Sequence, residues 1–170
     1  AYLAQGKRAE AVAEFETARA TDPQNTDTLG RLAKAYEADA RYADAVAVLA
    51  QLSQAGAADA RQLYRLGVLT CVVDPSAAAS RLAIAAEVPS PYQTPARQLL
   101  DAVSRATAQT DPALIYGTIG IALVQLQEWP PAEAALQQAV AANDTFADAF
   151  AYLGLAQDRQ GKDGAQALAQ

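Results

Sequence analysis

A fixed interval of 34 residues is the feature that most constrains how this sequence can fold. Three alanines are spaced by that interval, and a fourth follows after 53 residues, which is one interval plus 19 residues. These alanines are Ala11, Ala45, Ala79 and Ala132. The tripeptide QGK stands at residues 5–7 and 160–162, separated by four intervals plus the same 19 residues. Such periods are typical of solenoids, in which each unit packs against its neighbours. The two tripeptides are therefore predicted to be equivalent joints of a repeated unit.

The residues within each interval follow a pattern of paired helices. Small residues follow large ones at Leu66-Gly67 and Leu153-Gly154, where two backbones would approach closely. The closest copies of the pattern are Tyr2, Gly6, Ala11, Phe15, Ala18 and Pro23 in the first repeat, and Tyr116, Ile119, Gly120, Leu123, Ala132, Leu136 and Ala139 in the fourth. The pattern resembles the tetratricopeptide repeat. The second repeat has Ala40 in place of the helix-joining glycine, and the third has Asp74-Pro75 there and Ala83 in place of a large residue.

The resemblance implies an all-α, right-handed α-solenoid of antiparallel helix pairs. Residues 1–93 are expected to hold repeats 1–3, the first truncated at its start, and residues 113–170 to hold repeats 4 and 5, the last truncated. Both ends would leave apolar faces uncovered, whereas arrays normally end in polar caps. The sequence is therefore interpreted as an internal stretch of a longer array, or as its ordered part.

The 19 additional residues are predicted to form a single extra helix, a half repeat, within residues 94–112. Thr94-Pro95 has the character of a cap followed by proline at the first helical position, and Asp111-Pro112 repeats it for the next helix. One apolar face is marked by Leu99, Leu100, Val103 and Ala106, and the helix is expected to end near Ala108. One helix added to a two-helix alternation shifts its parity, so we expect a bend here. The alternative is a degenerate repeat that packs in line.

Composition excludes several classes of function. The net charge is −6 and the pI about 4.6, which argues against nucleic acid or an anionic membrane as a partner. With no histidine and with Cys71 as the single cysteine, common zinc sites and histidine-based triads cannot be built. No apolar run approaches the roughly 20 residues that cross a bilayer. We therefore expect no enzyme activity, catalytic residue, metal or cofactor, and no direct membrane insertion, and we interpret Cys71 as a packing residue.

The resemblance also implies a partner site, because the first helix of each tetratricopeptide pair lines a concave groove. The residues expected there are Arg31, Lys34, Arg61, Tyr64, Arg65, Val68, Val72, Ile121, Val124 and Gln125. Arg61 and Arg65 match the cationic pair of carboxylate-clamp domains, which grip acidic C-termini, but Arg31 stands where that clamp has asparagine. An acidic or C-terminal peptide is the predicted ligand, and a solvated charged face without a ligand is the alternative. The apolar part of the fourth repeat is expected to be covered by the extra helix, and a helix of a partner protein is the alternative.

These features together predict a non-enzymatic protein-interaction scaffold that binds a peptide or helix of a partner protein. By resemblance, the setting is a bacterial multiprotein or envelope assembly, with the cell envelope, periplasm and cytoplasm all left open. A regulatory array fused or accessory to an enzyme outside this segment is one alternative. A structural subunit whose groove is permanently filled within a larger complex is another.

Overall fold

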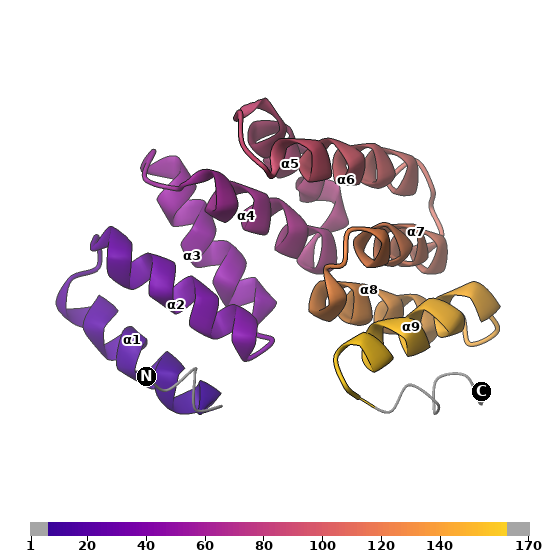
Figure 1. Ribbon diagram of the computed structural model, residues 1–170, viewed down its shortest axis with the longest axis horizontal. Coiled ribbons are helices and arrows are strands. Elements are labelled where there is room, and N and C mark those ends of the chain that lie inside the picture. The colour runs from indigo at the N-terminus through magenta and orange to yellow at the C-terminus, as the bar shows by residue number, and fades with distance from the viewer. Residues whose placement is uncertain (1–6, 163–170) are drawn as a thin grey trace.

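The computed structural model describes residues 7–162, and in that range the chain forms helices joined by short turns (Figure 1). In chain order these are α1 (Arg8–Thr21), α2 (Thr26–Ala38), α3 (Tyr42–Gln54), α4 (Ala60–Val73), α5 (Pro75–Glu87), α6 (Gln93–Ala106), α7 (Pro112–Gln125), α8 (Trp129–Ala142) and α9 (Ala147–Arg159). The prediction of an all-α, tetratricopeptide-like solenoid is confirmed. No helix among the described residues has the length and apolarity that a membrane span requires.

Short polar side chains begin several of the helices. Asp59 and Gln62 form a reciprocal capping box at the start of α4, with both hydrogen bonds at 2.8 Å. Asp111 accepts from the amide of Ala113 at 2.9 Å, and Pro112 follows it as the first residue of α7. This is the start that the sequence predicted, and it satisfies amides that have no partner within the helix.

The start of the extra helix differs from the prediction, and its end lies two residues before Ala108. Helix α6 begins at Gln93 and ends at Ala106, so Thr94 lies inside its first turn and is not its cap. Pro95 is accommodated because the amides of the first helical turn have no acceptor within the helix. The absence of an N–H in proline therefore costs no helical hydrogen bond. The side chain of Gln93 donates to the carbonyl of Ala86 at 3.1 Å, which ties the start of α6 to the end of α5.

Three of the joints share one backbone conformation, whereas Asp74, between α4 and α5, has a φ of −151°. Ala40, Gln127 and Gly161 have φ angles of 56°, 60° and 71°, in the left-handed region. In each case the next residue donates its amide back to a carbonyl of the preceding helix, as Lys162 does to Gln157 at 3.0 Å. The second QGK tripeptide is such a joint. In the first copy, Gln5 and Gly6 lie outside the described residues.

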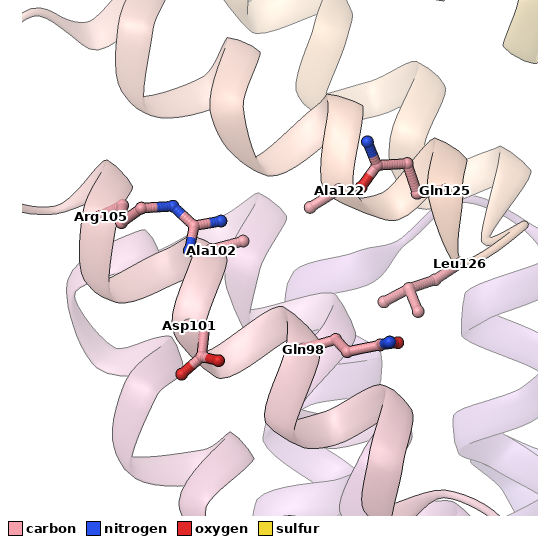
Figure 2. A pocket seen from close by; sticks show the side chains of 7 residues that line it. All are labelled: Gln98, Asp101, Ala102, Arg105, Ala122, Gln125 and Leu126. Carbon is pink, nitrogen blue, oxygen red and sulfur yellow. The ribbon is translucent and has the colours of Figure 1, made fainter.

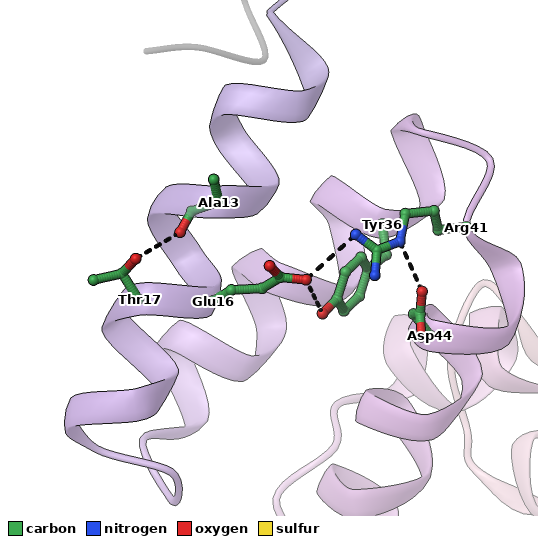
Figure 3. Close-up of polar contacts among 6 residues, drawn as sticks. All are labelled: Ala13, Glu16, Thr17, Tyr36, Arg41 and Asp44. Atoms are coloured by element: carbon green, nitrogen blue, oxygen red, sulfur yellow. Dashed lines mark hydrogen bonds and ion pairs between the residues drawn. The ribbon is translucent and has the colours of Figure 1, made fainter.

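Side chains next to the first of these joints tie α1, α2 and α3 together (Figure 3). Arg41 follows Ala40, and its guanidinium pairs with Asp44 at 2.7 Å and with Glu16 of α1 at 3.3 Å. The hydroxyl of Tyr36 donates to the same Glu16 oxygen at 2.8 Å, and the guanidinium lies 4.4 Å from the Tyr36 ring centroid.

Glycines allow the two helices of a pair to approach closely. A Cβ placed on Gly67 would lie 2.5 Å from Cδ2 of Leu82, and one on Gly120 would lie 2.6 Å from Cγ of Leu136. Both leucines are fully buried. The two glycines occupy equivalent positions in the α4–α5 and α7–α8 pairs, so the repeat encodes a packing requirement at both.

The array folds back on itself around α6. Figure 1 shows α1 to α4 ascending on one side, α5 and α6 at the far end, and α7 to α9 returning on the other side. Helix α4 contacts both α6 and α8, and α7 contacts α9. Helix α8 is the second helix of its pair, and it contacts α4, which is the first helix of another pair. The division into residues 1–93, 94–112 and 113–170 stays a prediction.

Candidate partner-binding site

The face of α4 that the sequence assigned to a partner packs against the chain's own helices. Tyr64, Val68 and Val72 are buried, with 3%, 0% and 6% of their surfaces exposed. The ring of Tyr64 stacks on Tyr92, which precedes α6, with centroids 5.4 Å apart. The side chain of Gln138 on α8 donates to the carbonyl of Val72 at 3.0 Å. Helices α6 and α8 thus cover the wall of α4 that would line a groove in an open array.

Arg65 pairs with two carboxylates supplied by the chain. Its guanidinium binds Glu37 at the end of α2 and Glu128, which precedes α8, and its side chain is 17% exposed. We call Arg65, Glu37 and Glu128 the clasp. Burial opposes the charge on Arg65, but the two carboxylates outweigh it and raise the pKa of the guanidinium. Burial, followed by the nearby Glu128 carboxylate, also raises the pKa of the Tyr64 phenol.

The other predicted cations lie at the surface. Arg61 is exposed, and its Nε donates to the hydroxyl of Tyr92 at 2.9 Å. Arg31 is exposed and pairs with Asp27 at 2.9 Å along α2. Lys34, one turn further along α2, is also exposed, and within residues 7–162 no ion pair forms at its ammonium. The structure therefore separates the predicted site into a buried part on α4 and an exposed part, which consists of Arg61 at the start of α4 and Arg31 and Lys34 on α2.

The predicted residues of α7 also divide into buried and exposed positions. Val124 is buried, Ile121 is partly buried, and Gln125 is exposed in a cleft beside α6. A Cβ on Gly117 would lie 2.5 Å from the ring of Phe146, so the residue preceding α9 covers that part of α7. Leu114 keeps 43% of its surface exposed. Cover for this helix therefore comes from α9 as well as from α6.

A cleft of about 380 Å³ opens where the first helices face the last ones. We call it the inter-block cleft. Its lining residues are Arg8, Glu37, Ala38, Ala40, Tyr42, Pro130, Glu133, Ala134, Gln137, Gln160 and Lys162. They come from α1, the α2–α3 joint, α8 and the end of α9. Sequence inspection did not identify this cleft, because its two walls belong to repeats that are not neighbours along the chain.

Glu133 is the central charge of one wall. It is 8% exposed, and it accepts from the Gln160 amide at 2.8 Å and pairs with Lys162. On the opposite wall, Glu37 is held by Arg65. Burial, followed by the Glu37 carboxylate, raises the pKa of Tyr42 to about 12, so this phenol stays protonated near neutral pH. The anionic groups of the cleft are thus already paired within the chain.

The cleft offers hydrogen bonds and one uncommitted cation. Among the described residues, Arg8 lines the cleft and has no ion pair. The amide N–H groups of Gln137 and Gln160 donate to Glu133, and their side-chain carbonyl oxygens supply acceptors. The part of the chain that the structure covers holds no group of three side chains suited to a metal ion. Cys71 is fully buried on α4, and burial raises the pKa of its thiol to about 12.

Comparison with known proteins agrees with the repeat pattern. The sequence model of the tetratricopeptide repeat family matches residues 2–66. Two crystal structures of MamA are similar to this chain, both with a TM-score of 0.47 and coverage of 99% of this chain. Their identities are 20% and 21%, over 88% and 81% of those chains. No curated protein matches the sequence. The match of the family model confirms the resemblance to the tetratricopeptide repeat over residues 2–66.

Proposed function

We propose that the chain is a non-enzymatic scaffold that binds a segment of another protein. The tetratricopeptide repeats of residues 2–66 support this, because such repeats present side chains of stacked helices to protein partners. The observation that carries the proposal is the inter-block cleft, which is preformed, polar and open to a segment entering from outside. A preformed site lowers the entropy cost of ordering the partner.

The partner segment is proposed to be acidic and to contact Arg8 and Lys34. Arg8 lines the cleft directly, and Lys34 stands four residues before Ala38, which also lines it. Residues four apart share one face of a helix, so Lys34 and Ala38 continue the same surface along α2. Neither cation is neutralised by another described side chain, whereas Arg65 is already held by two carboxylates.

A binding experiment tests this proposal by neutralising the two cations. The variant Arg8→Gln/Lys34→Gln is compared with Arg81→Gln/Arg97→Gln, which removes two cations from α5 and α6, away from the cleft. Both variants change the net charge equally. Immobilised wild-type and variant chains are exposed to an extract of the native cells, and captured proteins are quantified by mass spectrometry.

The expected result is loss of the acidic partner by the first variant only. Two lost charge-assisted contacts at about 0.7 kcal/mol each weaken binding about tenfold. Circular dichroism verifies that both variants keep the wild-type helicity. Equal capture by the two variants would show that the cleft and the α2 face are not the binding surface.

A further inference from the structure

A second cleft lies between α6 and α7, where the added helix interrupts the regular array. It has a volume of about 330 Å³ and is lined by Gln98, Asp101, Ala102, Arg105, Ala122, Gln125 and Leu126 (Figure 2). It shares no lining residue with the inter-block cleft. Its volume is within the range of sites that enclose a small ligand or a few residues of a peptide.

The polar side chains around this cleft are uncommitted. Gln98, Asp101, Arg105 and Gln125 are exposed, and no hydrogen bond or ion pair engages their side chains anywhere in residues 7–162. Other arginines of the array, such as Arg41 and Arg65, hold carboxylates. The guanidinium of Arg105 is therefore free to bind an anion at the edge of the α6–α7 cleft.

Arg105 does not pair with the acid on its own helix. Asp101 stands four residues earlier, a spacing at which aspartate and arginine often pair. Figure 2 shows the Arg105 side chain extended toward α7, whereas the Asp101 carboxylate turns away from α7. The guanidinium thus faces the recess and the carboxylate lies at its outer margin.

The floor between the polar groups is small and apolar. Ala102 is 2% exposed, and Ala122 and Leu126 are partly buried. Short side chains on both helices let a backbone approach closely. Gln98 and Gln125 stand on opposite sides of this floor, on α6 and α7. Each amide can donate to a peptide carbonyl and accept from a peptide N–H.

The charge of helices α6 and α7 differs in sign from that of the whole chain. Helix α6 has Arg97, Arg105 and Asp101 as its charged residues, for a net charge of +1, and α7 has none. The full chain has a net charge of −6. The two charged residues that line the cleft are Arg105 and Asp101, so the cation offered to an anion is the guanidinium that extends toward α7 (Figure 2).

From this geometry we propose that the α6–α7 cleft binds an extended internal segment of a partner protein through an aspartate or glutamate side chain. Arg105 holds the carboxylate with two parallel hydrogen bonds. Gln98 and Gln125 hold the flanking peptide groups, and the floor formed by Ala102 and Ala122 receives the backbone. This site is independent of the inter-block cleft, and it arises from the helix by which the chain departs from the regular repeat.

NMR titration of the intact 170-residue chain tests the assignment. The probe is the capped pentapeptide acetyl-AAEAA-amide, and the matched probe is acetyl-AAQAA-amide, which lacks only the charge. Signals of the Arg105 Nε–H and of the Gln98 and Gln125 side-chain amides are followed up to about 10 mM peptide, where an interaction of about 3–4 kcal/mol becomes visible. The expected result is saturable movement of these signals with the glutamate peptide, and at least about fivefold weaker binding of the glutamine peptide.

Two variants on one helix provide the control. Arg105→Gln is expected to abolish the difference between the two peptides, and Arg97→Gln, an exposed arginine of α6 that does not line the cleft, is expected to preserve it. Equal effects of the two variants, equal binding of the two peptides, or no movement at the highest concentration would each overturn the proposal. Sodium acetate added alone serves as a further probe. If it reproduced all three movements with the same affinity, the site would bind a free carboxylate and the peptide assignment would be wrong.

Discussion

Replacement of Arg65 by methionine tests whether the clasp holds the two arms of the array together. The change keeps an unbranched side chain of similar reach but removes the cation between Glu37 and Glu128. Removing one partner from a buried ion pair costs about 3–5 kcal/mol, because the remaining charge is desolvated without compensation. The three side chains are still 17%, 29% and 20% exposed, so we expect the lower end, about 3 kcal/mol of unfolding free energy.

A double-mutant cycle isolates the pair from other effects of the substitution. Arg65→Met, Glu128→Gln and the combined variant are unfolded in urea, and the expected coupling energy is about 2 kcal/mol. The matched control is the cycle of Arg31→Met with Asp27→Asn. That pair is 61% and 75% exposed, so its coupling should stay below about 0.5 kcal/mol.

Two spectroscopic signals report on different parts of the chain. Trp129 is the single tryptophan and begins α8, so its fluorescence reports on the returning arm, while far-UV circular dichroism reports on all helices. With the clasp intact we expect coincident transitions, and with Arg65→Met we expect the tryptophan transition to precede the other. A clasp coupling as small as that of the exposed pair, with transitions that still coincide, would refute the reasoning.

Three further predictions concern stability. Gln127→Gly should raise the unfolding free energy by about 1 kcal/mol, because Gln127 adopts a left-handed φ of 60°, and Gly161→Ala should lower it by a similar amount in urea titrations. Gly120→Ala should cost about 1–3 kcal/mol in the same assay, since the new Cβ would lie 2.6 Å from Cγ of Leu136, and an unchanged midpoint would contradict the packing argument. For Cys71, burial raises the thiol pKa from 9.0 to about 12. The contribution of the protonated thiol to the unfolding free energy is therefore fully present below pH 9. It is lost as the pH rises toward 12, because the thiol ionises at lower pH in the unfolded chain than in the folded one. Cys71→Ser, whose hydroxyl does not ionise in this range, should remove this part of the alkaline loss measured by thermal unfolding.

The sequence was sufficient for the local architecture because a solenoid is encoded by neighbouring contacts. Each helix pair needs a small residue opposite a large one, as at Gly67 and Leu82, and this requirement returns at the repeat interval. The left-handed joint at Ala40 was also predictable, since it stands one interval after Gly6. The exact start of α6 could not be predicted, because proline is compatible with either the first or the third position of a helix, and Pro95 occupies the third.

The long-range contacts could not be predicted from the interval. Arg65 and Glu128 are 63 residues apart, and Gln138 and Val72 are 66 apart. Whether such residues meet depends on the rotation summed over all intervening helices, to which each turn between helices contributes. A repeat pattern specifies each step but does not specify that sum. The predicted groove on α4 was consequently placed on a face that the fold covers.

The clasp explains why a partner should bind elsewhere than at Arg65. An acidic segment that approached Arg65 would have to displace Glu37 or Glu128, so one carboxylate would replace another and leave the displaced one unpaired. The exchange yields no new ion pair and adds the cost of desolvating a charge without a partner. Arg8, Lys34 and Arg105 involve no such exchange, because no described carboxylate holds them. An acidic partner should therefore bind Arg8, Lys34 and Arg105 more tightly than Arg65.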